Sequence, residues 1–295
     1  MTRRGIILAG GAGTRLHPVT RAVSKQLLPV YDKPMVYYPL ATLMQAGIQD
    51  ILLVSTRRDL PGFERLLGDG SQWGISIRYA VQDEPRGIAE AFLIGEEFLK
   101  GGPSALILGD NLFHGEGLDE LLVLASARTQ GATVFPYRVR DPERYGVLVL
   151  DEGGRPERIL EKPDPAPSSL AVTGLYFYDG RVSDVARNLA PSARGELEIT
   201  DVNNWYLRDG SLSATVLGRG VAWLDTGTHS ALLQASNYIQ AIEERQGLKV
   251  ALPGEVAWRA GFISDDRLAE LAASSLEGRE HSSYLRRLLT IGRGR

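Results

Sequence analysis

Short apolar runs alternate with helix-like patterns along the first two thirds of the chain. Buried strands are predicted at Gly5–Ala9, Ile51–Ser55, Ile75–Val81 and Ala105–Leu108. Helices are predicted at Lys33–Gly47, Gly87–Leu99 and Leu118–Thr129. Alternation of strand and helix is typical of a parallel α/β sheet, so this order predicts one.

Strand content rises after Ala132, and the end of the chain becomes helical. Further strands are predicted at Ala132–Val139, Gly146–Leu150, Ala171–Tyr178, Ser213–Val216 and Val221–Leu224. Further helices are predicted at Leu197–Leu207, Thr228–Gln246, Asp265–Ala273 and Ser282–Leu289, the second capped by Thr228 and ended by Gly247. There is no internal repeat and no interdomain linker. We expect an α/β catalytic core at residues 1–240, with residues 241–295 as a helical C-terminal extension packed on it.

Composition narrows the class of protein. The chain has 295 residues, of which 43% are hydrophobic, so it can bury a large core. A formal net charge of −3 argues against a nucleic-acid partner. The absence of cysteine excludes disulfides and thiolate catalysis. The chain contains no run of about 18 apolar residues, so no membrane span is predicted. The apolar N-terminal stretch breaks at Gly10-Gly11, unlike a signal peptide, so a cytoplasmic protein is expected.

The first predicted strand runs into a glycine-rich loop from Gly10 to Arg15. Such a loop can bring backbone N–H groups close to phosphate oxygens. The dinucleotide fingerprint fails because Leu16 stands where its third glycine should be, and the Walker pattern is absent. A plain tight turn is the alternative reading.

Two cations accompany this loop. Arg15 lies within it, and Lys25 follows in a largely apolar segment, where a buried cation would need a partner. Cations beside a glycine loop suit a triphosphate, whose charge must be neutralised before a nucleophile can approach. A solvated surface lysine is the alternative for Lys25.

Two acidic residues stand at the ends of predicted strands. Asp110 follows the strand Ala105–Leu108 after one glycine, and Asp225 follows Val221–Leu224. Ligands of open α/β sheets bind beyond the carboxyl ends of the strands. A pair of carboxylates there suits Mg²⁺ held together with substrate phosphates, although each could instead cap a turn or a helix. The four histidines have no ligand spacing and are interpreted as structural or surface residues.

Motifs in order along nearly the whole chain resemble those of the sugar nucleotidyltransferases, also called sugar-nucleotide pyrophosphorylases. These motifs are Gly10–Thr20, Ser24–Pro29, Tyr31–Met35, Leu108–Asn111, Asp141–Val147, Glu161–Pro163, Val172–Asp179, Gly195–Asn203, Trp223–His229 and Glu244–Lys249. Within that family the likeness is to thymidylyltransferases. The resemblance implies a Rossmann-like three-layer α/β fold with a mixed, mostly parallel central sheet. It also places a sugar-phosphate subdomain within residues 1–240.

The resemblance also implies a reaction and its residues. The thymidylyl group of dTTP would pass to α-D-glucose 1-phosphate by Mg²⁺-dependent in-line attack, giving dTDP-glucose and pyrophosphate, a first step toward dTDP-rhamnose or another dTDP-deoxysugar. The implied catalytic residues are Arg15, Lys25 and Lys162, and the implied metal ligands are Asp110 and Asp225. The implied nucleotide-binding residues are Leu8, Gly10, Gly11, Gly13, Thr14, Arg15, Gln26, Gln82, Gly87 and Asp110. The implied sugar-phosphate residues are Asn111, Tyr145, Gly146, Glu161, Lys162, Val172 and Tyr176.

Gln82 is the expected reader of the base. It ends a predicted strand, and its amide can donate to and accept from a pyrimidine edge at once. Relatives read closer to Gln-Pro-x-Pro-x-Gly-Leu-Ala-Gln-Ala. This chain departs from them with Asp83, Glu84 and Arg86, and it keeps Gly87.

The resemblance further implies a homotetramer with a second site for a feedback regulator such as dTDP-rhamnose. The segment Phe113–Gly117 departs from the family pattern in that region. Two other functions remain as alternatives. An NAD-dependent sugar enzyme is disfavoured by the missing third glycine. An inactive regulatory paralogue would lack one of four charged residues, all of which are present, namely Lys25, Asp110, Lys162 and Asp225.

Overall fold

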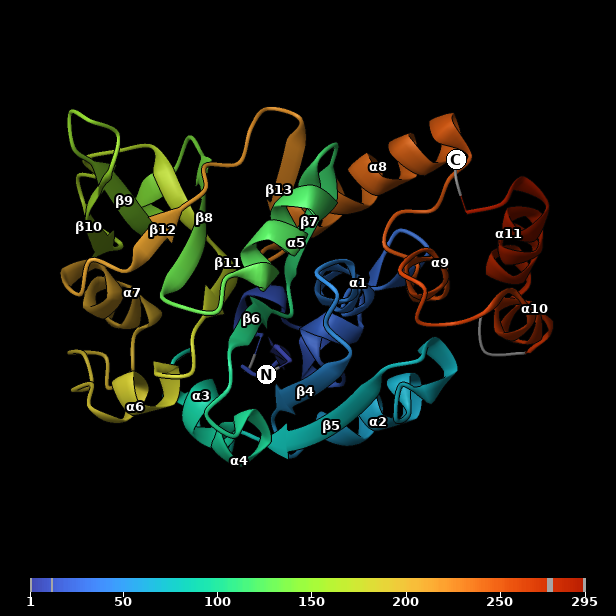
Figure 1. The fold of residues 1–295 in the computed structure, drawn as a ribbon, viewed down its shortest axis with the longest axis horizontal. Helices are drawn as coiled ribbons and strands as arrows, with labels where there is room; N and C mark the ends of the chain where they lie inside the picture. The colour runs from blue at the N-terminus through green and yellow to red at the C-terminus, as the bar shows by residue number, and fades with distance from the viewer. Residues whose placement is uncertain (1, 12, 275–277, 294–295) are drawn as a thin grey trace.

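In the computed structural model, which describes residues 2–11, 13–274 and 278–293, the centre is a nine-stranded mixed sheet (Figure 1). Seven strands follow the order β10-β9-β11-β6-β1-β4-β5; β8 pairs with β11, and β12 pairs with β8. The strands are β1 Arg4–Leu8, β4 Asp50–Ser55, β5 Ser76–Val81, β6 Ser104–Leu108, β8 Ala132–Arg138, β9 Gly146–Leu150, β10 Pro156–Glu161, β11 Leu170–Tyr178 and β12 Leu212–Ala214.

The first half of the chain forms a parallel part of the sheet. Strand β1 lies between β4 and β6 and is parallel to both. Successive side chains of a strand point to opposite faces, and Ile6 and Ile7 of β1 are both fully buried. They belong to two different apolar clusters, one on each face of the sheet. Helices must therefore cover both faces.

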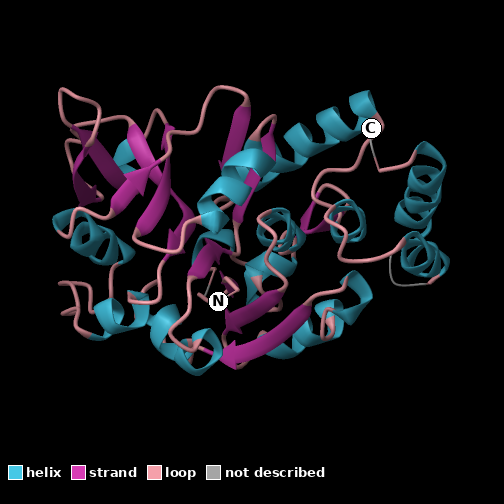
Figure 2. Cartoon of the chain, in the orientation of Figure 1, coloured by secondary structure: helices cyan, strands magenta, loops and turns pink. Residues whose placement is uncertain are grey.

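Helices on both sides of the sheet make three layers (Figure 2). The helices in the cluster of Ile7 include α1 Tyr37–Gln45, α2 Leu60–Leu67, α5 Leu118–Ala127 and α9 Pro253–Arg259. The helices in the cluster of Ile6 are α3 Glu90–Ile94, α4 Glu96–Leu99, α6 Val182–Arg187 and α7 Ile199–Arg208. The expected three-layer α/β arrangement is confirmed.

Strand β11 joins the parallel part of the sheet to an antiparallel part. All nine of its residues are buried, and it pairs antiparallel with β6, β8 and β9. A strand covered on both faces reads as a continuous apolar run, which is why this one was predictable. Strand β10 then pairs antiparallel with β9, and this register places Glu161 opposite Gly146.

The C-terminal part is helical, as predicted. It contains α8 His229–Gln246, α9, α10 Asp265–Ala273 and α11 Gly278–Ile291. The hydroxyl of Thr228 accepts a hydrogen bond from the Ala231 N–H, and Gly247 ends α8 in the left-handed conformation. A separate ribbon of β7 Asn111–Gly115 and β13 Val221–Asp225 stands beside the sheet.

Several elements differ from the sequence prediction. Helix α1 begins at Tyr37, because Lys33 and Pro34 form strand β3, which pairs with β2, Pro29–Val30. The predicted helix 87–99 starts only at Glu90 and is divided into α3 and α4 at Gly95. Strand β7 and the helices α2, α6 and α9 were not predicted.

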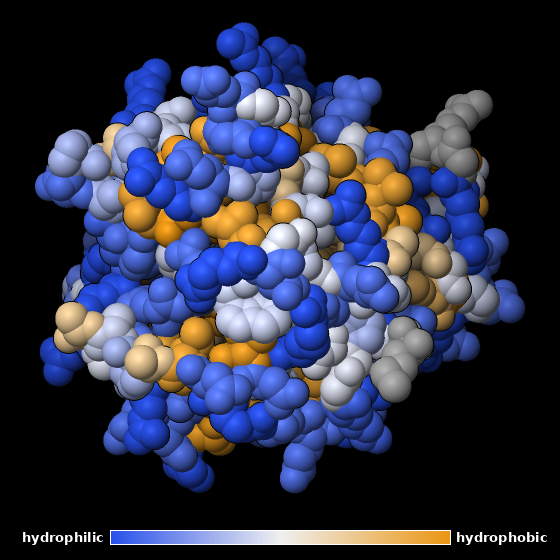
Figure 3. All heavy atoms as spheres, turned by 60° about the vertical axis from the view of Figure 1, so that its left-hand side comes forward, coloured by the Kyte–Doolittle hydropathy of each residue, from blue (hydrophilic) through white to orange (hydrophobic). Residues whose placement is uncertain are grey.

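The surface of the molecule is mainly hydrophilic on the face that Figure 3 shows. Hydrophilic side chains cover most of the face shown in Figure 3, with hydrophobic areas between them. Within the described part of the chain, no helix is long and apolar enough to cross a membrane.

Candidate active site

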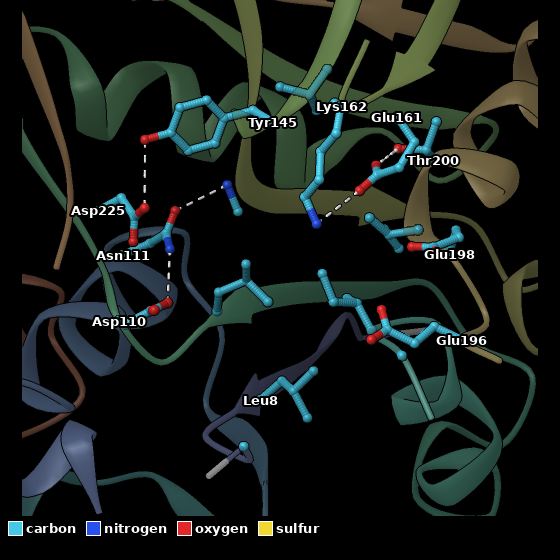
Figure 4. Close-up of a pocket in the computed structure, with 18 of the residues that line it drawn as sticks. Leu8, Asp110, Asn111, Tyr145, Glu161, Lys162, Glu196, Glu198, Thr200 and Asp225 are labelled. Carbon is cyan, nitrogen blue, oxygen red and sulfur yellow. Dashed lines mark hydrogen bonds and ion pairs between the residues drawn. The ribbon is translucent and has the colours of Figure 1, made fainter. Parts of the chain in front are cut away.

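A cavity of about 610 Å³ is lined by residues from both parts of the sheet and from α7 (Figure 4). Most of the predicted site residues line it: Leu8, Gly10, Gly11, Arg15, Gln82, Gly87, Asp110, Asn111, Tyr145, Gly146, Glu161, Lys162, Val172, Tyr176 and Asp225. The structure therefore brings together side chains that the sequence separates by more than 200 positions.

The glycine loop forms one end of this cavity and a smaller pocket of about 240 Å³ beside it. Gly10, Gly11 and Arg15 line both spaces, whereas Gly13, Thr14 and Lys25 line only the smaller one. Gly13 has φ +58°, and a Cβ there would lie 3.2 Å from the side chain of Thr20. This backbone conformation and the close neighbour explain why glycine is needed at this position.

Lys25, which lines the smaller pocket, forms an ion pair with Asp110, which lines the larger cavity. The Lys25 Nζ donates to Asp110 Oδ2, and both side chains are largely buried. Burial alone would raise the pKa of Asp110, but Lys25 and the Asn111 amide overcome this effect and hold it below its usual value. Asp110 is therefore a carboxylate with its own cation.

Asn111 lies beside both acidic residues. Its Nδ2 donates to Asp110 Oδ1 over 3.0 Å, and its Oδ1 accepts from Trp223 Nε1 over 2.7 Å. Asn111 also lies opposite Asp225 in the β7–β13 pair. It is 3% exposed, so its position fits a residue that orients Asp110.

Asp225 faces the same space with a different balance of charge (Figure 4). The Tyr145 hydroxyl donates to its Oδ2 over 3.5 Å, and the nearest Arg144 nitrogen is 3.7 Å from that oxygen. Burial and the neighbouring Asp110 raise the pKa of Asp225 above its usual value, despite the nearby cations. The pair of carboxylates thus carries an excess of negative charge that the neighbouring cations, Lys25, Arg144 and Arg15, only partly offset.

The opposite end of the cavity, here called the β10–α7 end, comprises Glu161, Lys162, Arg194 and Thr200. Glu161 Oε2 accepts from the Thr200 hydroxyl over 2.6 Å, and its Oε1 accepts from Arg194 over 3.2 Å. Lys162 lies 3.4 Å from the same carboxylate and has φ +44°, a conformation rare outside glycine. Two cations and an oriented acidic residue therefore stand at this end.

The glycine-loop end comprises Gly10, Gly11, Arg15, Gln82 and Gly87. No carboxylate among the described residues pairs with Arg15, whose side chain is exposed. Gly87 has φ +103°, and a Cβ there would lie 2.4 Å from the Leu197 carbonyl oxygen. The apolar side chains around this end are Leu8, Pro85, Ile88 and Leu108.

Gln26 lies away from both spaces. It is 3% exposed and accepts a hydrogen bond from the Ser24 hydroxyl over 2.7 Å. Its side chain also packs against Gly109, where a Cβ would lie 3.0 Å from Gln26 Cγ. Its expected role as a nucleotide ligand remains a prediction.

Sequence reasoning did not assign roles to several lining residues: Arg144, Arg194, Glu196, Glu198, Thr200 and Trp223. Arg194 bonds to both oxygens of Glu198 at 2.9 Å and so stays near the cavity. The segment Gly195–Asn203 resembles a family motif and was the available signal for its acidic residues and Thr200. Arg194 lies one residue outside that motif.

A glycine loop, clustered cations and paired carboxylates at strand ends define a site for nucleotide phosphate chemistry. The sequence model of the nucleotidyl transferase family matches residues 4–242, and the chain belongs to that family. It is 57% identical over 290 residues to the glucose-1-phosphate thymidylyltransferase of Xanthomonas campestris, covering 98% of each chain. It is 56% identical to the enzyme of the same name from Neisseria meningitidis, covering 97% of this chain and 99% of that one.

Solved structures agree in fold. The structure of a proposed glucose-1-phosphate thymidylyltransferase from Bacillus anthracis, in complex with sucrose, has a TM-score of 0.74 and 40% identity. That match covers 80% of this chain and 95% of that one. A UDP-glucose pyrophosphorylase with bound UDP-glucose has a TM-score of 0.71 and 25% identity, covering 82% and 100%.

Proposed function

We propose that this chain transfers the thymidylyl group of dTTP to α-D-glucose 1-phosphate, forming dTDP-glucose and pyrophosphate. The observation that carries the proposal is one cavity with a cation-bearing glycine loop at one end. Two further cations and an oriented carboxylate stand at its other end, and the paired acids Asp110 and Asp225 line the same cavity. The high identity to thymidylyltransferases supports the same nucleotide and sugar.

The proposed mechanism needs no general base. A phosphate monoester has a second pKa of about 6, so the sugar phosphate is already a nucleophile at neutral pH. One of its oxygens attacks the α-phosphorus of dTTP, and pyrophosphate leaves from the opposite side. The task of the protein is to align the two phosphates and to offset their charge.

Each end of the cavity has a part in this alignment. Backbone groups of the glycine loop and Arg15 hold the triphosphate and balance the leaving pyrophosphate, since Arg15 has no carboxylate partner among the described residues. Lys162 holds the sugar phosphate, with Arg194 as a second cation at the same end. Glu161, fixed by Thr200, accepts hydrogen bonds from the hexose hydroxyls. Lys25, which is paired with Asp110, offsets negative charge at the reacting phosphates.

Asp110 and Asp225 fit a magnesium ion. Mg²⁺ is commonly bound by one or two carboxylates together with substrate phosphates and water. The raised pKa of Asp225 beside Asp110 indicates excess negative charge at this place, which a divalent cation would neutralise. When bound, Mg²⁺ would polarise the α-phosphate.

The test is an assay for nucleotide and sugar dependence. The purified chain is incubated with dTTP, Mg²⁺ and glucose 1-phosphate, and both pyrophosphate and dTDP-glucose are quantified. We expect equal amounts of the two products and no pyrophosphate without the sugar phosphate. Pyrophosphate release that ignores glucose 1-phosphate, or no release at all, would contradict the proposal.

A further inference from the structure

Thr20 follows the glycine loop but lines neither the cavity nor the smaller pocket. Among residues 17–22, all of which the structure describes, it alone is buried, with 1% of its surface exposed. Its neighbour Val19 is 48% exposed. Burial of apolar surface alone would place the valine inside and the threonine outside. The buried position of Thr20 therefore has another cause.

The side chain of Thr20 contacts Gly13 of the glycine loop in two ways. Its hydroxyl donates to the Gly13 carbonyl over 2.8 Å, and its Cγ2 lies 3.2 Å from the place that a Cβ on Gly13 would take. The same carbonyl accepts from the Leu16 N–H over 2.9 Å. A carbonyl oxygen has two lone pairs, so both donors can bind it at once. Together they hold the plane of the peptide that joins Gly13 to Thr14.

That peptide belongs to the wall of the smaller pocket. Gly13 and Thr14 both line this pocket, beside Arg15 and Lys25. In a trans peptide the carbonyl and the following N–H lie on opposite sides, so fixing the Gly13 carbonyl also fixes the direction of the Thr14 N–H. Backbone N–H groups whose direction is already set bind phosphate oxygens without reorganisation.

We propose that Thr20 is a positioning residue whose hydroxyl holds the glycine loop in its phosphate-binding conformation and so strengthens binding of the β- and γ-phosphates of the nucleotide. The glycines that let the loop approach a phosphate also leave its backbone many alternative conformations. A loop that is already ordered loses less conformational entropy when the ligand binds. Thr20 supplies this order from outside the pocket.

Two substitutions separate the parts of the Thr20 contact. Thr20→Val keeps the branched shape and removes the hydroxyl donor, whereas Thr20→Ser keeps the hydroxyl and removes the methyl group. Thr42→Val is the matched control, because Thr42 is also buried and donates its hydroxyl to a backbone carbonyl, that of Tyr38, over 3.0 Å. Thr42 belongs to α1 and lines neither the cavity nor the smaller pocket.

The experiment compares dTTP with dTMP, which share the base and the sugar and differ in the two outer phosphates. Because the inference rests on the proposed function, dissociation constants are measured by calorimetry without sugar phosphate, and transfer is measured separately with glucose 1-phosphate. We expect Thr20→Val to bind dTTP roughly threefold to tenfold more weakly than the wild type, with dTMP unchanged. Thr20→Ser and Thr42→Val should keep the wild-type ratio of the two dissociation constants.

The ratio separates positioning from a general structural role. A purely structural defect weakens binding of both nucleotides together and leaves their ratio unchanged. A wild-type ratio in Thr20→Val would overturn the inference. The same loss in Thr20→Ser would also overturn it, because the methyl group and not the hydroxyl would then hold the loop. Nucleotide binding without transfer to glucose 1-phosphate would instead contradict the proposed function alone.

Discussion

The two ends of the cavity hold their charges in different ways. At the β10–α7 end, Glu161 is fixed by Thr200 and Arg194 before any ligand arrives. At the glycine-loop end, Arg15 has no carboxylate partner among the described residues. Neutral sugar hydroxyls bind best to hydrogen-bond acceptors that are already oriented. A triphosphate is itself negatively charged, so it can serve as the anionic partner of an unpaired cation. Under the proposed function, this difference predicts a sugar end that is preorganised and a nucleotide end that its substrate completes.

The largest expected effect concerns the paired acids Asp110 and Asp225, which line the same cavity as both ends. Asp225→Asn should lower kcat/KM by roughly 10²–10⁴-fold, about 3–5 kcal/mol, because a metal clamp acts on charge that develops in the transition state. Steady-state rates across a range of Mg²⁺ concentrations measure this change. Unchanged turnover in the variant, or full activity of the wild type in excess EDTA, would exclude the proposed metal site.

The same two acids should respond differently when stability is measured. In EDTA, Asp110→Asn should lose about 3 kcal/mol of unfolding free energy, because it leaves Lys25 largely buried without its partner. Asp225→Asn should gain about 1 kcal/mol, because the raised pKa shows that folding disfavours its charged form. Urea unfolding at neutral pH measures both values. Equal losses of unfolding free energy in the two variants would contradict this prediction, because they would show that nearby cations offset both carboxylates to the same extent.

The preorganised end can be tested through Thr200. Thr200→Val removes the hydrogen bond to Glu161 while keeping the side-chain volume, so the carboxylate loses its fixed orientation. We expect the KM for glucose 1-phosphate to rise roughly fivefold to thirtyfold, about 1–2 kcal/mol, with little change in the KM for dTTP. Thr129→Val, at an exposed position after α5, is the control. An equal rise in both KM values would argue against a separate sugar end.

The smallest expected effect concerns the base. A single methyl group buried among apolar side chains contributes about 1 kcal/mol, so dTTP should be used roughly fivefold better than dUTP. UTP should be accepted with lower kcat/KM than dTTP, and purine triphosphates should be poor substrates. Rates at fixed glucose 1-phosphate measure this order. A preference for UTP over dTTP would refute the thymidylyl assignment, and a preference for GTP would refute the pyrimidine pocket.

Much of the fold could be predicted because the buried strands are continuous apolar runs. The prediction was wrong at Lys33, which was expected in a helix but belongs to strand β3. Its side chain forms a buried ion pair with Glu243, which lies 210 residues later in the sequence. Strand β7 was missed because β13, the strand that pairs with it, lies about a hundred residues later. Local patterns contain no information about such contacts.

The candidate site shows the same limit. The glycine loop and the strand-end acids have local signatures, so they could be named from the sequence. Arg194 could not, because its position depends on Glu198 and Glu161, which only the folded chain brings beside it. The side-chain hydrogen bond from Gln82 to Glu90 likewise joins residues that belong to different elements. The sequence predicts which residues take part more readily than how each is oriented.

The two lysines provide the most direct test of the two-ended site. Lys25→Met and Lys162→Met are matched changes at the pocket of the glycine loop and at the β10–α7 end. Steady-state kcat and KM for dTTP and glucose 1-phosphate are measured for both. The account predicts that Lys162→Met mainly raises the KM for glucose 1-phosphate and that Lys25→Met mainly lowers kcat. The reverse pattern, or the same pattern in both variants, would contradict it.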